Sequence, residues 1–240
     1  MSYAGTVAAD SPLLWFRCRE SYGASLISSG SDNVPAFPTS RPGAQLGLTG
    51  IAIDGGAICT FESALMAAYT STQLVASTGF SLETWVYVAP VGSFSGGSAV
   101  DLVVQVTFGG LASLQLGVTG LTWKAVLRDN NGAAHDVQGG SNLGPNRWHH
   151  LVGVQHAGTA LKELWVDGVS QGTGTGNVIA SAQYGVFTIR PGGTDGPPFV
   201  GEMAVYAHEL SGSAIAAHHA AAELSGPPTQ RNGLNGVCVT

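Results

Sequence analysis

The residues of this chain that are best suited to chemistry gather in one stretch, RWHHLVGVQHAGTALKELWVDG, residues 147–168. Histidine exchanges a proton near neutral pH, and a neighbouring carboxylate would complete an acid–base pair. The stretch also predicts a β-hairpin, because apolar strand residues precede an Asp-Gly turn. Its candidate side chains are Trp148, His149, His150, His156, Trp165 and Asp167.

The two-residue period of a strand decides which of these side chains are free for chemistry. Trp148 and His150 share a face with Val152 and Val154, which favours a packed tryptophan beside a hydrogen-bonded histidine over a catalytic histidine. Asp167 is expected to hydrogen-bond the backbone of its own turn. Three side chains of the hairpin then face outward and stay open to contact: His149, His156 and Trp165.

The carboxylates of this chain do not form the pattern of a glycosidase. Glycoside hydrolysis needs two carboxylates that face one sugar bond. Glu163 and Asp167 would share a strand face only if their strand continued through the turn. For Glu202, in a later strand, we expect a structural hydrogen bond rather than general acid catalysis. Residues 168–172, GVSQG, match the letters of the G-x-S-x-G motif, but they directly follow the Asp-Gly turn and lead into no predicted helix, so we expect no nucleophile elbow there. A Ser-His-Asp triad stays open. We predict a protein that is not an enzyme and assign no catalytic residue.

A calcium site would need several oxygen ligands that converge from loops. Turn chemistry explains each loop carboxylate or amide alone, so we predict no metal site and no cofactor, with calcium as the alternative. The three cysteines lack C-x-x-C spacing and are expected to pack as small hydrophobic side chains. The loop residues are Asp54, Asp101, Asp129, Asn130, Asn131 and Asp195, and the cysteines are Cys18, Cys59 and Cys238.

Sugar binding without a metal would use an exposed aromatic side chain beside amide groups. Phe94, Trp123 and Tyr184 are candidates, but each fits a core position equally well. The ligand-binding residues are therefore unknown from sequence. The adjacent His218 and His219 of a predicted helix are expected to lie on a solvated face.

Composition favours a turn-rich all-β protein of one domain. The 240 residues include 35 glycines, and only 10% are charged, which is more glycine and less charge than soluble domains usually carry. The net charge of −6 and the absence of Lys/Arg clusters argue against nucleic acid as a partner. Low surface charge suggests that partner subunits cover part of the surface.

The ends and hydrophobic runs of the chain indicate where it is made. The first 20 residues lack the basic segment and the long apolar run of a secretory signal. No apolar run reaches the length of a membrane span. We therefore expect a chain without a signal peptide that is produced in the cytoplasm.

Short strands separated by turns are predicted along most of the chain. The clearest is 80–88, which is apolar on both faces and so should be covered on two sides. Residues 62–69 are expected to form a short helix, and 211–224 a longer one with Ser211 as N-cap. The remaining predicted strands cover 13–19, 24–27, 50–53, 57–61, 100–108, 111–118, 121–127, 133–138, the hairpin, 184–190 and 199–206.

This order of elements predicts an all-β fold, a two-sheet antiparallel jelly-roll sandwich with one short C-terminal helix. We divide the chain into a polar N-terminal arm (1–12), a jelly-roll domain (13–225) and a C-terminal tail (226–240). The tail has no periodicity and is expected to dock on another surface.

Four segments, taken in order, resemble the signatures of LamG-like jelly-roll domains in the concanavalin A-like lectin/glucanase superfamily. The resemblance covers about residues 13–224 and implies the jelly-roll fold. Glucanases of this superfamily carry their catalytic acids at alternating positions of one strand. This chain lacks such a cluster of acids, so the resemblance does not extend to glucanase activity. The segments are FSLETWVYV (80–88), NRWHHLVGV (146–154), LKELWVDGV (161–169) and FVGEMAVYAHELSGSAIAAHH (199–219).

The N-terminal run, residues 3–33, is similar to LamG-like proteins encoded among the tail and virion genes of actinobacterial phages, although it departs from many of them at Arg17–Glu20. This resemblance implies a non-enzymatic structural virion protein, a capsid decoration or tail-associated subunit that contributes to host adhesion. Its partners would be other virion subunits, including copies of itself, and a host glycan. The alternative is a carbohydrate-binding module that recognises a host cell-wall or surface glycan.

Overall fold

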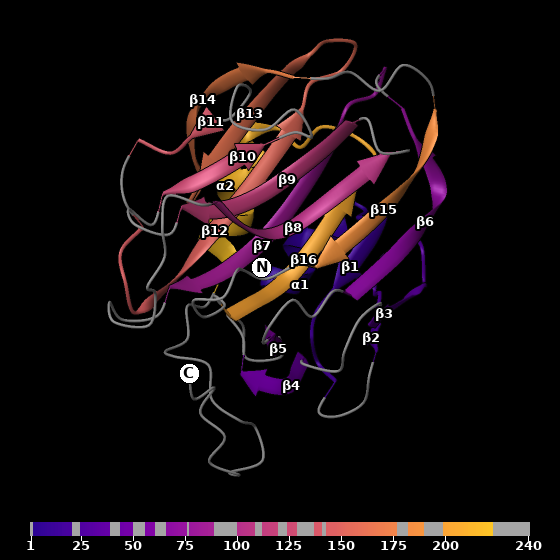
Figure 1. The fold of residues 1–240 in the computed structure, drawn as a ribbon, viewed down its shortest axis with the longest axis vertical. Helices are drawn as coiled ribbons and strands as arrows, with labels where there is room; N and C mark the ends of the chain where they lie inside the picture. The colour runs from indigo at the N-terminus through magenta and orange to yellow at the C-terminus, as the bar shows by residue number, and fades with distance from the viewer. Residues whose placement is uncertain are drawn as a thin grey trace.

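Two antiparallel sheets pack face to face, and two helices cover the outer face of one of them (Figure 1). The predicted all-β, two-sheet jelly-roll sandwich with a short C-terminal helix is thus confirmed. No helix in the described part of the chain has the length and apolar character needed to cross a membrane. The computed structural model describes residues 2–20, 25–38, 44–49, 56–60, 66–75, 77–88, 100–108, 112–119, 124–128, 137–140, 143–176, 182–189 and 199–222.

The first sheet is built around β7, which pairs with β12 along its whole length and with β16 on its other side. The strand order is β14-β13-β12-β7-β16-β5-β4, and β1 also pairs with β16. The bounds are β1 Leu14–Phe16, β4 Ala44–Thr49, β5 Gly56–Thr60, β7 Phe80–Val88, β12 Arg147–Gln155, β13 Leu161–Val166, β14 Val169–Thr175 and β16 Phe199–Tyr206.

The second sheet has the order β11-β10-β9-β8-β15-β6-β3-β2 and lies over the inner face of the first. Strand β15 is central, because it pairs with β8 on one side and β6 on the other. The bounds are β2 Leu26–Ile27, β3 Pro35–Pro38, β6 Met66–Leu74, β8 Val100–Phe108, β9 Ala112–Thr119, β10 Ala125–Arg128, β11 Val137–Gln138 and β15 Gln183–Ile189.

Apolar side chains from alternate strand positions form the core between the sheets. Phe16 of the first sheet stacks on Phe187 of the second with ring centroids 5.4 Å apart. Phe80 meets Phe108 edge to face at 5.3 Å. Because each large buried side chain contributes about 1.5–3 kcal/mol, these contacts fix how the sheets lie on each other.

The two helices begin at serine caps. The Ser2 side chain accepts a hydrogen bond from Gly5 N at the start of α1 (Tyr3–Ala9). Ser211 does the same for Ala214 N at the start of α2 (Gly212–Ala221), as predicted. Residues 3–9 therefore form a docked helix where the sequence predicted a polar arm.

Strand β6 contradicts the helix predicted over 62–69, at least from residue 66 onward. The segment is rich in alanine, but it pairs with β15 on one side and β3 on the other. Tertiary pairing overrides the local preference of alanine here. Cys18 is buried, as expected. Three predictions lie outside the described residues: the strand over 50–53, the tail over 226–240 and the packing of Cys238.

Gly79 and Gly158 both adopt a positive φ, but only Gly79 faces close backbone. A Cβ at Gly79 would clash with the Gln155 carbonyl oxygen, whereas a Cβ at Gly158 would meet nothing within 4 Å. Gly158→Ala should therefore lower the free energy of unfolding by roughly 1–2 kcal/mol, the strain of the backbone alone. Gly79→Ala should cost about 1–3 kcal/mol more. Urea unfolding measures both, and equal losses would contradict the proposed steric contact.

Candidate functional site

A fully buried carboxylate, Glu83, lies in the middle of β7. The strand period turns it away from the core between the sheets and toward the helices, on the same face as Trp85. A charged residue is almost never buried without partners, so its surroundings identify the polar centre of the molecule.

Four side chains from four different elements surround the Glu83 carboxylate. On Oε1, His150 Nε2 lies 2.7 Å away and the Tyr3 hydroxyl donates at 3.2 Å. On Oε2, the Tyr206 hydroxyl donates at 2.6 Å and His218 Nδ1 lies at 3.0 Å. These contacts match the capacity of a carboxylate, which accepts about four hydrogen bonds.

The network extends from Glu83 into both helices. Trp85 Nε1 donates to the Tyr3 hydroxyl at 3.1 Å, which leaves that hydroxyl free to donate to Glu83. His218 of α2 places its second ring nitrogen, Nε2, 2.9 Å from Asp10 Oδ2 at the C-terminal end of α1. One histidine therefore bridges a carboxylate of the sheet and a carboxylate of the other helix.

Burial and charge set the protonation of this cluster. Burial alone would raise the pKa of Glu83, but the charges of His218 and His150 and their hydrogen bonds hold it well below its ordinary value. Burial would lower the pKa of His218, but Glu83 and Asp10 raise it to about 9. Burial and the Glu83 charge raise the pKa of Tyr3 and Tyr206 well above the usual tyrosine value. At neutral pH the protonated His218 ring thus lies between the carboxyl groups of Glu83 and Asp10.

This arrangement has the groups of an acid–base site but lacks access. Glu83, His150 and His218 expose no surface, and both helices lie over them. Geometry of this kind stabilises the attachment of α1 and α2 to the sheet, and a substrate would reach it only after a helix had left.

A second cluster surrounds Asp167, whose φ of 50° and the φ of 77° at Gly168 form the tight turn between β13 and β14. Its carboxylate accepts from the backbone N–H of His150 at 2.8 Å and lies 2.9 Å from His149 Nδ1. Burial opposes ionisation, but the hydrogen bond from His149 lowers the pKa of Asp167. The prediction that Asp167 caps its own turn is therefore wrong, because the carboxylate reaches the neighbouring strand β12.

The structure corrects the side chains predicted to face outward. His149 is buried and lies 2.8 Å from the Gly144 carbonyl as well as against Asp167. His156 is half-buried, with Nδ1 2.8 Å from Glu209 Oε2. Trp165 is half-buried and packs on Gly212 of α2. None of the three stands free in solvent.

The histidine pair on α2, His218 and His219, also lies differently from the prediction. His218 is buried in the Glu83 cluster, and His219 stacks on Trp85 with ring centroids 5.9 Å apart. Burial lowers the pKa of His219 despite the nearby Asp167. Only part of His219 is exposed, so the predicted solvated face is wrong.

The remaining carboxylates have separate structural contacts. Glu202 accepts from Trp15 Nε1 at 2.8 Å and from Arg17 Nε at 3.4 Å, which confirms the predicted structural hydrogen bond. Glu163 lies 3.4 Å from His156 Nε2, at the other end of β13 from Asp167. Glu163 and Asp167 are thus not brought together.

Most predicted ligand residues fall outside the described part of the chain. Among the described residues, no group of three or more His, Cys, Asp or Glu side chains is arranged to hold a metal ion. Of the aromatic candidates, Tyr184 is described, and it is exposed. The candidates outside the described residues are Asp54, Asp129, Asn130, Asn131, Asp195, Phe94 and Trp123.

Sequence reasoning missed the residue at the centre of the site, Glu83. The signal was present, because a carboxylate in a strand predicted to be covered on both faces needs a buried partner. Tyr3 and Asp10 gave no comparable signal, since their segment resembled a polar arm. Their role follows only from the docking of α1.

Removing the Glu83 charge should loosen both helices. Glu83→Gln leaves His218 without its main counter-charge, so we expect the free energy of unfolding to fall by about 3–5 kcal/mol. Glu209→Gln is the matched control, because the Glu209 side chain is 37% exposed and its pair with His156 should contribute about 0–1 kcal/mol. Denaturant titration compares them, and similar losses in both variants would contradict the central role of Glu83.

The raised pKa of His218 predicts how stability varies with pH. The folded value is about 9 and the ordinary value is 6.5. The protonated folded state is therefore favoured fully below pH 6.5, and this stabilisation is lost as pH rises through 9. Glu83 acts oppositely, because its lowered pKa gives stability that is lost as pH falls below 4.5. We expect maximum stability between these limits.

The His218 contribution can be separated from other titrating groups by substitution. Wild type should lose on the order of 3 kcal/mol more than His218→Gln between pH 6 and pH 9. His156→Gln serves as the control, since His156 is half-buried and lies outside the Glu83 cluster. Parallel curves for wild type and His218→Gln, measured by thermal unfolding in matched buffers, would contradict the assignment.

Comparison with solved structures finds the same fold in proteins of low sequence identity. The botulinum neurotoxin serotype D binding domain has a TM-score of 0.61 and 11% identity, covering 90% of this chain and 52% of its own. The receptor-binding domain of neurotoxin type G gives 0.61 and 13%, with 88% and 51% covered. Trypanosoma rangeli sialidase gives 0.60 and 14%, with 87% and 32% covered. This chain therefore spans a third to a half of these neighbours.

Comparison with curated proteins finds no match. A family model described as the concanavalin A-like lectin/glucanases superfamily matches residues 64–216, which include β7, β12 and β16 of the first sheet and the first half of α2. The match covers more than half of the sequence. The chain therefore belongs to the concanavalin A-like lectin/glucanase superfamily, as the four sequence segments had indicated.

Proposed function

We propose that this chain is a non-enzymatic structural subunit of a bacteriophage particle, a capsid decoration or tail-associated protein, whose lectin-like jelly roll adheres to a glycan of the host surface. The particle assignment is supported by the resemblance of residues 3–33 to phage virion proteins. A low content of charged residues, 10%, suits a surface that neighbouring subunits cover in part.

The observation that carries the non-enzymatic part is the burial of the acid–base groups. Glu83, His150 and His218 have the chemistry of a hydrolase, but they hold helices to a sheet beneath a covered face. Glu163 and Asp167 are the other two carboxylates considered as a glycosidase pair. They have separate partners, because Glu163 contacts His156 and Asp167 contacts His149. We therefore infer recognition of a sugar without cleavage, because these described carboxylates do not form the facing pair that glycoside hydrolysis needs.

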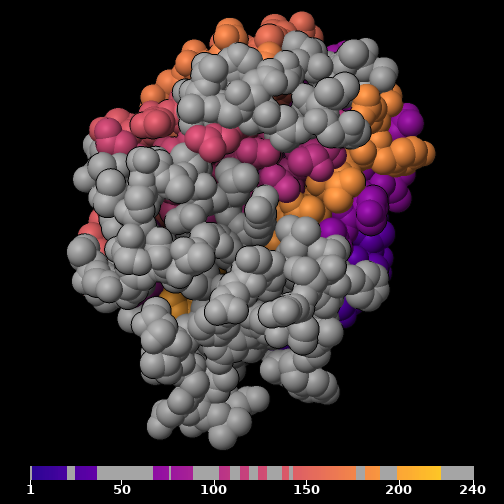
Figure 2. Space-filling view, viewed as in Figure 1, coloured from indigo at the N-terminus to yellow at the C-terminus, as the bar shows by residue number. Residues whose placement is uncertain are grey.

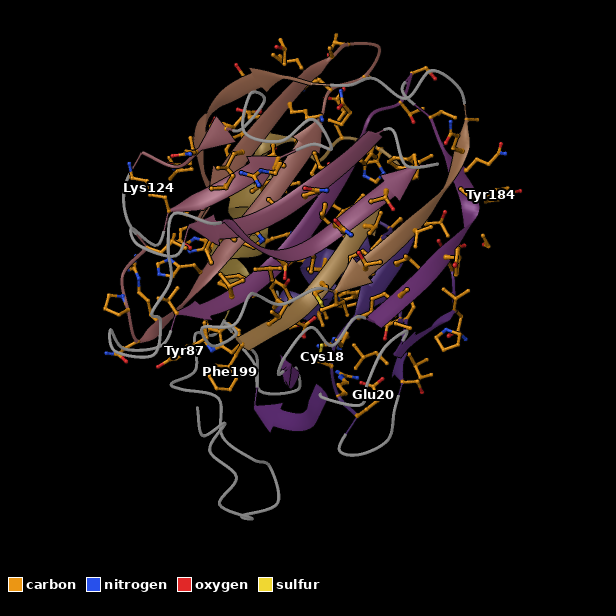
Figure 3. The ribbon with its side chains drawn as sticks, viewed as in Figure 1. Cys18, Glu20, Tyr87, Lys124, Tyr184 and Phe199 are labelled. Atoms are coloured by element: carbon orange, nitrogen blue, oxygen red, sulfur yellow. The ribbon has the colours of Figure 1, made fainter. Side chains whose placement is uncertain are left out.

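Glycan adhesion is supported by the fold and by an aromatic side chain on the surface. One solved neighbour, the neurotoxin D ligand-binding domain, is described in complex with N-acetylneuraminic acid, at 11% identity. In this chain, Tyr184 exposes 57% of its surface on the second sheet (Figure 3). The second candidate, a carbohydrate-binding module independent of any particle, rests on the same tyrosine.

The adhesion proposal predicts binding without turnover. The full chain, labelled and applied to a glycan array and to isolated actinobacterial cell envelopes, should bind at least one glycan, and the bound oligosaccharide should be recovered intact. Chelation with EDTA should leave binding unchanged. Absence of binding to the array and to the envelopes would remove the adhesion function, and cleavage of the sugar would contradict the non-enzymatic assignment.

The particle proposal has its own test. Mass spectrometry of purified particles from phages that encode this chain should find it in a fixed copy number relative to the major capsid protein. Its absence from the particles, together with glycan binding by the isolated chain, would favour the independent carbohydrate-binding module.

A further inference from the structure

Two exposed tyrosines lie on neighbouring strands of the second sheet. Tyr69 on β6 exposes 67% of its surface and Tyr184 on β15 exposes 57%. Strands β15, in orange, and β6, in purple, run side by side at the right of the space-filling view (Figure 2). The Tyr184 side chain points away from the ribbon (Figure 3). Large aromatic side chains left exposed in this way commonly mark a recognition surface.

The strand register places both rings on the outer face. Val186 lies opposite Tyr69, so their side chains share a face, and Tyr184 is two residues before Val186. Gly185, between them, faces inward, because a Cβ there would lie 2.9 Å from Val106 Cγ1 of the core. The two tyrosines are therefore diagonal neighbours across adjacent strands, within reach of one ligand.

A β-bulge beside the tyrosines is held by a buried carboxylate. Between the pairs Tyr184–Gln73 and Val186–Tyr69, β6 contains two more residues than β15. Asp32 Oδ2 accepts from Ser71 N at 2.6 Å and from Thr72 N at 3.3 Å, and the Ser71 hydroxyl donates to Oδ1.

On the other side of the bulge, the Thr70 hydroxyl accepts from Gly185 N at 2.8 Å. Asp32 itself is only 6% exposed. Bulges redirect side chains and are common beside binding sites, and this one is fixed from both sides. Tyr69 is consequently held in place rather than left on a loose strand.

The described side chains that are exposed beside the rings are polar and uncharged. Ser71, Thr72 and Gln73 are exposed beside Tyr69, and Gln73 lies directly opposite Tyr184. Thr107 of β8 lies opposite Val186 on the far side of β15. Hydroxyl and amide groups offer hydrogen bonds to sugar hydroxyls, and an aromatic face packs on the C–H face of a sugar ring.

We propose that Tyr69 and Tyr184, with Thr72 and Gln73, form the binding site for a neutral oligosaccharide. This inference rests on the proposed adhesion function and names the site that performs it. The neutral character follows from the absence of a charged side chain among the outward residues named on this face. A protein partner fits less well, since the core of a stable protein interface needs a larger apolar area than the two rings and the exposed Ile27 of β2 provide among hydroxyl and amide groups.

Isothermal titration with neutral hexasaccharides tests the site. The probes are cellohexaose, chitohexaose and mannohexaose, together with the best neutral ligand of the array, and N-acetylneuraminic acid is the charged comparison. The double variant Tyr69→Ala/Tyr184→Ala should weaken binding of the neutral ligand at least tenfold. Tyr69→Phe/Tyr184→Phe should stay within threefold of wild type, because the stacking face is kept.

The matched control is Val169→Ala, since Val169 is 61% exposed but lies on β14 of the other sheet. It should bind as wild type, and urea midpoints confirm that every variant folds. Wild-type affinity in the double alanine variant would place the site elsewhere and leave the adhesion function standing. Failure of wild type to bind any array glycan or envelope would remove both. Loss of self-association or particle attachment with unchanged sugar affinity would show that the tyrosines contact protein, and would overturn the inference.

Discussion

The structure depends on a charge that is fully buried at the centre of the first sheet, the Glu83 carboxylate. Leaving such a charge without partners costs several kcal/mol, and β7 is paired on both sides, so Glu83 cannot turn to solvent. Neighbouring strands and helices must therefore supply its hydrogen-bond partners. His150 and Tyr206 contact the carboxylate from adjacent strands, and Tyr3 and His218 contact it from the two helices. The helices are short, with 7 and 10 residues, and such helices need tertiary contacts to persist.

As a result, the outer faces of the two sheets differ: the helices cover one, and the other carries exposed side chains. The outer face of the first sheet is closed by α1 and α2, and its histidines and carboxylates stabilise that closure. We infer that recognition of another molecule takes place on surfaces that the Glu83 cluster does not use. On the second sheet, the exposed rings of Tyr69 and Tyr184 flank a bulge that Asp32 holds. The superfamily includes lectins and glucanases, and for this chain we infer that it recognises a glycan without cleaving it.

The fold could be predicted because the sequence and the packing agree. Strand 80–88 and the strands of the hairpin were found from alternating apolar residues, and four ordered segments resembled one family. The site could not be predicted as well, since it joins residues from distant parts of the chain. Tyr3 and Glu83 are 80 residues apart, and His218 is 135 residues from Glu83. On α2 the buried positions are Ile215 and His218, so polarity alone did not reveal which side faces inward. Strand β6 was missed because pairing with β15 overrode its alanine content.

The most direct test of the central claim is native-state hydrogen exchange of wild type and Glu83→Gln, read amide by amide. If Glu83 holds both helices to the sheet, the amides of Thr6 in α1, of Ile215 in α2 and of the C-cap residue Ala222 lose protection together in the variant. Amides of β8, β9 and β15 keep theirs, because their bonds lie in the other sheet. Unchanged protection of the helices in the variant, or loss of protection in one helix alone, would contradict the account.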